Sequence, residues 1–377
     1  MVLRYLRKSR PECQGSHQVG CLRARMPVQE GKDVQVQVHY PGDHAAQHLT
    51  NEQEPLFRHG VLENLGAKQG IPMWMLQSLF KYSMQHDPPV APSTASKWPV
   101  VLFSSGIFGS CEMYTQFCRD LASFGMIVFA MEHEDGSGIY ASDSNGQVIP
   151  YLDPPSGADI QSFREPNLQQ RTKEIAEMAQ ALQALQQATP ESGTPLAQVL
   201  QQADPARMAL VGHSLGAAGV VRYLRTTSEQ GEACPFKFAM FMDLWPEPLK
   251  QEDLAFAPQV DFAMILSGEW MTFSSFLSGN LQIISNSSNA TAQCRAALQV
   301  PGTSHQWISE TQMIAPFWVL RRSGLMGSGD WLRCYAATAQ ASGQLLVSAL
   351  GGKEHQDLEK LDPDVLKKID SSERNVL

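Results

Sequence analysis

The residues best suited to chemistry lie in the pentapeptide Gly212-His-Ser-Leu-Gly216, which matches the pattern G-x-S-x-G. The four apolar residues 208–211 before it predict a short buried strand, and residues 217–224 after it predict a helix. Between a strand and a helix, this pattern is typical of a sharp turn that holds a serine nucleophile at the edge of a sheet. A side chain at either glycine would collide with the neighbouring strand or helix. The sequence therefore predicts Ser214 as a nucleophile.

A serine nucleophile needs a general base, and the base needs an acidic residue to orient it. In hydrolases with this kind of turn, the three residues follow one another in the order serine, acid, histidine. Two histidines follow Ser214, namely His305 and His355. His305 lies in a loop after a predicted strand at 297–300, whereas His355 lies in a charged tail. His305 is therefore the predicted base.

Two other histidines are less suited to be the base. His213 adjoins Ser214, and we expect its side chain to point away from the serine hydroxyl. His133 ends a predicted strand at 126–131, ahead of the serine, so we expect it to be a structural residue or one at the edge of the site.

Two carboxylates end strands that follow the serine. Asp243 ends the predicted strand 238–242, and Glu269 ends the next one, 262–267. Asp261 begins that next strand and so lies at the opposite edge of the sheet. Asp243 is the first choice for the acid and Glu269 the alternative, because a buried carboxylate at this edge would hold the imidazole in one tautomer.

An ester hydrolase also needs two N–H groups that bind the oxyanion of the tetrahedral intermediate. Leu215 supplies one at the start of the predicted helix. The second is expected from Gly106-Ile107, in the loop after the predicted strand 99–103. Glycines at 106 and 109 allow this backbone to approach a substrate closely.

The elements that position these residues alternate between strand and helix from residue 97 onward. Predicted strands lie at 34–40, 99–103, 126–131, 208–211, 238–242, 262–267 and 297–300, and predicted helices at 114–124, 168–185, 217–224, 311–325 and 332–350. This alternation predicts an α/β fold with a mostly parallel central sheet covered by helices on both faces. We expect one catalytic domain over 31–350, a disordered arm over 1–30 and a charged tail over 351–377.

Residues 71–84 predict a further helix, because large apolar residues recur at three- and four-residue steps. These residues are Met73, Trp74, Met75, Leu76, Leu79, Phe80 and Met84. Two interpretations are open: the face packs into the core, or its side chains enter a lipid surface.

Composition narrows the function classes. The net charge is −9, and basic residues form no long stripe, so nucleic acid is not an expected partner. The seven cysteines show no metal-binding spacing, and the sequence lacks G-x-G-x-x-G, P-loop and H-E-x-x-H motifs, so no metal or other cofactor is expected.

The Arg-rich residues 1–26 lack a signal peptide's apolar core and predict a disordered arm or, alternatively, a transit peptide. No apolar run could span a membrane. We expect a cytoplasmic protein that can associate with a membrane surface.

Several segments together resemble the platelet-activating factor acetylhydrolase family, the group VII-type, calcium-independent phospholipases A2. They are Leu102-Phe-Ser-Ser-Gly-Ile-Phe-Gly109, Asp120-Leu-Ala-Ser-Phe-Gly-Met-Ile-Val128, Glu132-His133, Gln170-Arg-Thr-Lys173, Val211-Gly-His-Ser-Leu-Gly216, Met242-Asp-Leu-Trp245 and Gly302-Thr-Ser-His-Gln306. The resemblance covers roughly residues 36–350 and implies an α/β-hydrolase fold. It also implies a triad of Ser214, Asp243 and His305, with oxyanion donors at Ile107 and Leu215.

The resemblance further implies a substrate and the residues that face it. The substrate would be a phospholipid with an sn-2 acetyl, short or oxidised acyl ester, at a membrane or lipoprotein surface. The segment 73–76 aligns with the family's interfacial helix, so we expect the following residues to face substrate or interface: Trp74, Met75, Leu76, Phe108 and Trp245.

The chain departs from the family pattern beside the nucleophile and in the oxyanion loop. Ser105-Gly106 replaces the usual His-Gly, Leu215 replaces a Phe, and Ala217 replaces a Gly. These changes bear on which acyl groups the enzyme would prefer.

Two alternative functions stay open: a broad-specificity carboxylesterase or lipase for other esters, and a non-catalytic binding scaffold.

Overall fold

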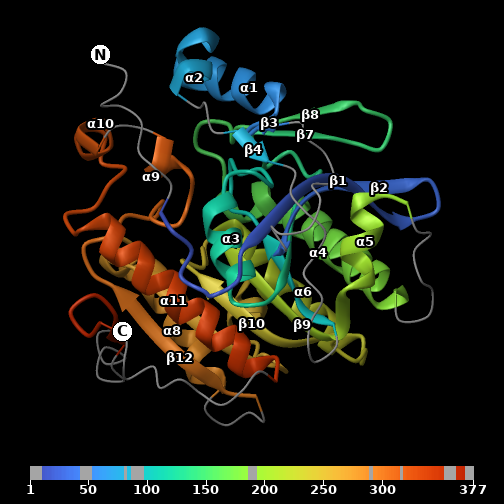
Figure 1. Cartoon of the computed structure of the whole chain (residues 1–377). Coiled ribbons are helices and arrows are strands. Elements are labelled where there is room, and N and C mark those ends of the chain that lie inside the picture. Colours follow the sequence, from blue (N-terminus) through green and yellow to red (C-terminus); the bar gives the residue numbers. More distant parts are fainter. Residues whose placement is uncertain are drawn as a thin grey trace.

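The computed structural model describes residues 11–42, 53–79, 83–85, 97–185, 193–287, 292–314, 317–351 and 362–369. The strands of its main sheet are β1 (Val19–Gln29), β2 (Lys32–Pro41), β5 (Trp98–Ser104), β6 (Ile127–Met131), β9 (Ala203–His213), β10 (Phe236–Met242), β11 (Asp261–Ser267), β12 (Cys294–Val300) and β13 (Lys367–Lys368). They lie side by side in the order β1-β2-β6-β5-β9-β10-β11-β12-β13. Figure 1 labels β1, β2, β9, β10 and β12 among them. Outside this sheet, β3 (Gln53–Pro55) pairs with β4 (Ser83–Gln85), and β7 (Tyr140–Ser142) pairs with β8 (Val148–Pro150).

The centre of the main sheet is parallel. All pairs from β6 through β12 run parallel, whereas β1, β2 and β13 join antiparallel at the two edges. The predicted mostly parallel sheet is confirmed. Because β9 lies between β5 and β10, its carboxyl end, which carries the G-x-S-x-G turn, opens in the middle of the sheet edge.

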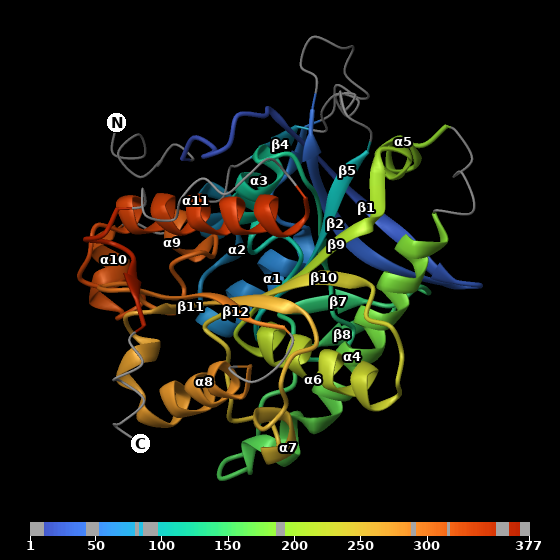
Figure 2. The same cartoon turned by 90° about the horizontal axis from the view of Figure 1, so that it is seen from below.

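Helices cover both faces of the sheet. The helices of the described residues are α1 (His59–Gln69), α2 (Met73–Leu79), α3 (Thr115–Ser123), α4 (Ile160–Ala184), α5 (Pro195–Gln201), α6 (Leu215–Glu229), α7 (Gln251–Leu254), α8 (Ser274–Asn286), α9 (Thr311–Ile314), α10 (Phe317–Arg322) and α11 (Trp331–Ala349), with a 3₁₀ turn, η2 (Trp270–Thr272). Figure 2 shows α3 and α11 on one face and α4, α6 and α8 on the other. No helix in the described part of the chain is long and apolar enough to cross a membrane.

Two hydrophobic cores, one on each face, explain why the central strands contain continuous apolar runs. Along β9, Ala209 and Val211 belong to the core under α3 and α11, whereas Met208 and Leu210 belong to the core under α4 and α6. Alternate side chains of a strand point to opposite faces, so a strand covered on both sides needs apolar residues at every position.

The predicted disordered arm over 1–30 is wrong for residues 19–29, which form β1. This strand pairs with β2 along its length, from the Val19–Pro41 pair to the Gln29–Lys32 pair. The basic residues of this strand interrupt the apolar pattern that would predict it from the sequence. One of them, Arg25, forms an ion pair with Asp33 on β2. Residues 1–10 lie outside the described residues.

The predicted tail over 351–377 also contains structure, because Lys367 and Lys368 form β13 on the edge of β12. Residues 352–361, which include His355, and 370–377 lie outside the described residues. The predicted helix over 71–84 is too long, because residues 83–85 form β4, whereas the described part of α2 spans Met73–Leu79. Residues 80–82, which include Phe80, lie outside the described residues. Figure 1 places α1 and α2 together at one end of the molecule, beside β3 and β4.

Candidate active site

Ser214 occupies a strained turn between β9 and α6. Its backbone has φ 56° and ψ −122°, and its N–H donates to the Met242 carbonyl at 2.9 Å. A Cβ on Gly212 would lie 2.7 Å from Ala217 Cα, and one on Gly216 would lie 2.2 Å from the Ser104 carbonyl oxygen. Both positions therefore require glycine, as the sequence predicts.

Backbone strain is concentrated around this turn. Among the described residues, three non-glycine residues have positive φ: Phe108, Ser214 and Asp243. They lie after β5, β9 and β10, which are neighbours in the sheet. Such conformations cost of order 1–3 kcal/mol each and cluster at functional sites, where the surrounding structure holds them. Their convergence at one sheet edge marks that edge as the candidate site.

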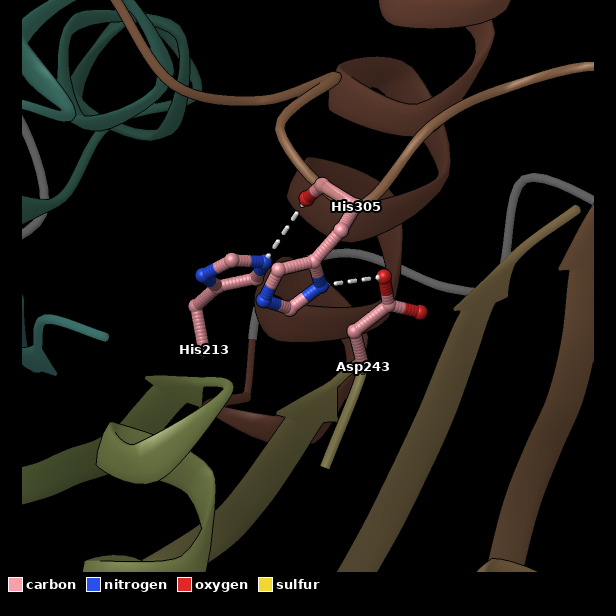
Figure 3. Close-up of side chains that lie close together, drawn as sticks. All are labelled: His213, Asp243 and His305. Atoms are coloured by element: carbon pink, nitrogen blue, oxygen red, sulfur yellow. Dashed lines mark hydrogen bonds and ion pairs between the residues drawn. The ribbon is translucent and has the colours of Figure 1, made fainter. Parts of the chain in front are cut away.

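Asp243 and His305 form a hydrogen-bonded pair at the same edge. His305 Nδ1 lies 2.8 Å from Asp243 Oδ2 (Figure 3). The fully buried Asp243 carboxylate also accepts the N–H and the hydroxyl of Ser267, each at 2.6 Å. Burial raises the pKa of Asp243, and the two donors of Ser267 limit that rise by stabilising the ionised form. The carboxylate is thus arranged to hold one tautomer of His305, with the proton on Nδ1.

The His305 ring is held between two other rings. Trp270 stacks on one face with centroids 3.9 Å apart and planes 12° apart, and His213 stacks on the other at 4.4 Å and 25°. Burial lowers the pKa of His305, because the imidazolium would lose hydration there. The imidazole is therefore neutral at pH 7, and its Nε2 can accept a proton.

Glu269, the alternative acid, has a different partner. Its Oε2 accepts the backbone N–H of His305 at 2.6 Å, whereas the imidazole nitrogen contacts Asp243. Glu269 therefore holds the histidine loop in place. Within the described residues, no hydrogen bond joins Ser214 Oγ to His305. Catalytic hydrogen bonds are often long before substrate binds, so this geometry is compatible with proton transfer in a complex.

In the loop after β5, the backbone N–H groups on either side of Ile107 are hydrogen-bonded. Gly106 N–H donates to Tyr114 Oη at 3.3 Å, and Phe108 N–H donates to the Ser137 carbonyl at 2.8 Å. Ile107 N–H, between them, has no partner in the described part of the chain. Leu215 is the first residue of α6, where an N–H has no intrahelical acceptor. A Cβ on Gly106 would lie 3.1 Å from Ser214 Cβ, so the loop packs directly against the nucleophile.

Ser104, His133 and Glu174 form another hydrogen-bonded chain, which starts at the end of β5. His133 Nε2 lies 2.8 Å from Ser104 Oγ, and its Nδ1 lies 2.7 Å from Glu174 Oε2. All three residues are buried, so no substrate can reach the serine. The chain ties the end of β5 to α4, which agrees with a structural role for His133. Its partners could not be identified from the sequence, because they lie on separate elements.

Arg171 on α4 also supports the site, and its contacts were not predicted from the sequence. Its guanidinium donates to the Ser105 carbonyl at 2.5 Å and pairs with Asp135 at 2.9 Å, and both charged side chains are fully buried. It also donates to the Ser137 hydroxyl at 2.6 Å. Arg171 thus anchors the loop that carries Ile107.

Replacing Arg171 with methionine is expected to lower the free energy of unfolding by about 3–5 kcal/mol, because Asp135 would keep a buried charge without a partner. Urea denaturation at pH 7 measures this loss. The matched control is Lys173→Met on the same helix, where the side chain is 63% exposed and the effect should stay below about 1 kcal/mol. Equal small effects for both variants would contradict the role given to Arg171.

Two groups of side chains in the described residues bring possible metal ligands together. One is His213, Asp243 and His305, and the other is Cys111, Glu112 and Glu132. In the first, the ring nitrogens nearest the group already make hydrogen bonds. In the second, the Arg58 guanidinium contacts both carboxylates, and burial raises the pKa of the Cys111 thiol, which keeps it protonated. We assign a metal to neither group.

The residues predicted to face substrate or lipid divide into two sets. Trp74 is 71% exposed, and Met75, Phe108 and Trp245 are half-buried. The prediction for Leu76 is wrong: it is only 2% exposed and lies in the core that includes α1. Gly66 on α1 leaves room for Leu76, since a Cβ there would lie 3.0 Å from its Cδ1.

Comparisons with known proteins show similarity to one family. The family model described as platelet-activating factor acetylhydrolase, isoform II, matches residues 5–371. The platelet-activating factor acetylhydrolase of Canis lupus familiaris is 26% identical over 284 residues, which cover 69% of this chain and 60% of that protein. That of Bos taurus is 29% identical over 180 residues, covering 44% and 39%. The chain thus spans less than two thirds of the length of these relatives.

A solved structure supports the fold independently. Ferulic acid esterase from Streptomyces cinnamoneus is 16% identical and superposes with a TM-score of 0.63 over 96% of both chains. At this identity the likeness bears on the fold alone, and with the sheet described above it confirms the predicted α/β-hydrolase fold.

Proposed function

The chain belongs to the platelet-activating factor acetylhydrolase family, and we propose that it is a serine esterase that removes sn-2 acetyl, short or oxidised acyl groups from phospholipids. The observation that carries the proposal is the Asp243–His305 hydrogen bond beside the strained Ser214 turn. The family match and the names of the two relatives support the substrate class.

In the first half of the proposed reaction, His305 Nε2 takes the Ser214 hydroxyl proton as Oγ attacks the ester carbonyl carbon. Asp243 holds the imidazole in position and stabilises the imidazolium that forms. The N–H groups of Ile107 and Leu215 stabilise the oxyanion. When the intermediate collapses, the bond to the glycerol oxygen breaks, and that oxygen takes the proton from His305. The lysophospholipid leaves, and the acyl group remains on Ser214.

In the second half, a water molecule replaces the lysophospholipid. His305 takes a proton from this water as its oxygen attacks the acyl-serine. Collapse of the second intermediate returns the proton to Ser214 Oγ and releases the carboxylic acid. No metal is needed, since backbone N–H groups stabilise the charge that a metal would otherwise carry.

A hydrolysis panel tests the substrate class. Phosphatidylcholines with sn-2 chains from acetyl to long unmodified acyl are offered with and without vesicles, alongside p-nitrophenyl acetate. We expect kcat/KM to fall as the unmodified chain lengthens. A strict preference for long unmodified chains would contradict the short-acyl proposal. Equal activity on soluble esters with no gain on phospholipid would indicate a broad carboxylesterase instead.

We also propose that α2 contacts the lipid surface through Trp74, whose exposed ring can enter the interface region of a bilayer. Trp74→Ala should raise the apparent KM on phospholipid vesicles by about tenfold or more, because burying a large apolar side chain contributes roughly 1.5–3 kcal/mol. The rate on p-nitrophenyl acetate should not change. Leu332→Ala on α11 is the control, since Leu332 is an exposed apolar residue on another element. A similar effect of both variants on vesicles would contradict a specific role for α2.

A further inference from the structure

His213 is hydrogen-bonded through both ring nitrogens to segments on either side of the nucleophile. Its Nδ1 lies 2.8 Å from Tyr114 Oη, and its Nε2 lies 3.1 Å from the backbone carbonyl of His305 (Figure 3 shows the second contact). Its ring is fully buried and also stacks on the His305 imidazole. A residue whose side chain was expected only to point away from the hydroxyl therefore contacts the candidate base directly.

The partners of His213 allow one arrangement of protons. The His305 carbonyl can only accept, so Nε2 must carry the proton and donate it. Nδ1 is then an acceptor, and Tyr114 must donate its hydroxyl proton to it. Burial raises the pKa of Tyr114 and lowers that of His213 to about 3, so at pH 7 both groups are in the neutral form that this arrangement needs. Tyr114 Oη in turn accepts the Gly106 N–H at 3.3 Å.

We propose that Tyr114 and His213 are positioning residues that join the oxyanion loop to the loop of the catalytic base in one hydrogen-bonded chain. The chain runs from the Gly106 N–H, next to Ile107, to the carbonyl of His305. It fixes the distance between the groups that stabilise the oxyanion and the group that moves the proton. This role rests on the proposed esterase function, because it concerns the same site.

The link has a physical consequence for turnover. The two loops follow different strands, β5 and β12, and β9, β10 and β11 lie between them in the sheet. Without the chain, each loop can shift separately, and a misplacement of about 1 Å can cost about 100-fold in rate. Substrate binding depends less on this spacing, so the loss should be in kcat and not in KM.

The test is a double-mutant cycle of Tyr114→Phe and His213→Gln, assayed on p-nitrophenyl acetate. Each single variant should lower kcat by roughly tenfold to 100-fold and change KM by less than about twofold. If the residues act in one chain, the double variant should be no slower than the slower single variant. The control is Tyr335→Phe, which removes another buried tyrosine hydroxyl. That hydroxyl donates to Asp120 away from the site, so the variant should leave kcat unchanged.

Three outcomes would overturn the proposal. They are losses in kcat that multiply in the double variant, a change in KM without a change in kcat, and wild-type kcat in either single variant. A spectroscopic measurement decides the matter if the variants do not fold. In wild-type protein with ¹⁵N-labelled histidine at pH 7, His213 should be neutral with its proton on Nε2, and a proton on Nδ1 would refute the chain. Wild-type protein that hydrolyses no ester would contradict the esterase function, while the tautomer would still report on the chain.

Discussion

Replacing Ser214 with alanine is expected to lower kcat by about 10⁶-fold, because the serine, histidine and aspartate of such a site act as a unit. The remaining rate would come from the oxyanion donors and substrate binding, which still contribute about 10³–10⁴-fold over water. The measurement is kcat on platelet-activating factor and on p-nitrophenyl acetate. The fold should be preserved, because only a hydroxyl group is removed.

The control is Ser228→Ala near the other end of α6, which should keep wild-type kcat. A fluorophosphonate probe offers a second readout, since it should label the wild-type protein and the control but not Ser214→Ala. A Ser214→Ala variant with near-normal esterase activity would refute the nucleophile assignment.

Asp243→Asn is expected to lower kcat by about 10⁴-fold with a smaller effect on KM. The asparagine amide can present N–H to His305 Nδ1, which would move the imidazole proton to Nε2 and prevent that nitrogen from acting as a base. Glu269→Gln is the matched control. Glu269 contacts the backbone of His305 and not its ring, so this variant should lose less than about tenfold in kcat.

The comparison of these two variants decides between the two carboxylates that the sequence left open before the resemblance was considered. A greater loss from Glu269→Gln than from Asp243→Asn would exchange their roles. Equal and small losses would mean that neither carboxylate orients the base.

The candidate site could be predicted in large part, because its residues follow from local patterns and chain order. Gly212 and Gly216 are required by contacts with α6 and β5 that the strand–turn–helix pattern implies. His305 follows from its place after the last long strand. The same patterns located the central strands, whose burial on both faces favours continuous apolar runs such as residues 208–211.

The features that were missed depend on contacts between distant segments. β1 carries two basic residues whose charges are balanced by distant segments: Arg25 pairs with Asp33 on β2, and Arg23 lies 3.7 Å from Glu112. Trp74 and Leu76 are two positions apart in the helix and so point to different sides of it. Only the packing of α2 on α1 shows that Leu76 is the buried one and Trp74 the exposed one. Arg171 reads as an ordinary helical residue until the fold places the Ser105 carbonyl beside it.

The surroundings of His305 could not be anticipated for the same reason. His213 ends β9 and Trp270 begins η2, and no spacing rule predicts that their rings enclose the imidazole. This enclosure removes water from the base and limits rotation of its ring. Both effects favour a neutral imidazole with a fixed direction for proton transfer.

The most direct test of the account is to trap the acyl-enzyme. Wild-type protein is mixed with platelet-activating factor, quenched in acid within the first turnover, and digested for peptide mass spectrometry. We predict an acetyl group on Ser214 of the peptide that contains Gly212–Gly216, and none in the Ser214→Ala variant. Release of acetate with no acetyl on Ser214 under any quench time, or an acetyl group on another residue, would contradict the proposed mechanism.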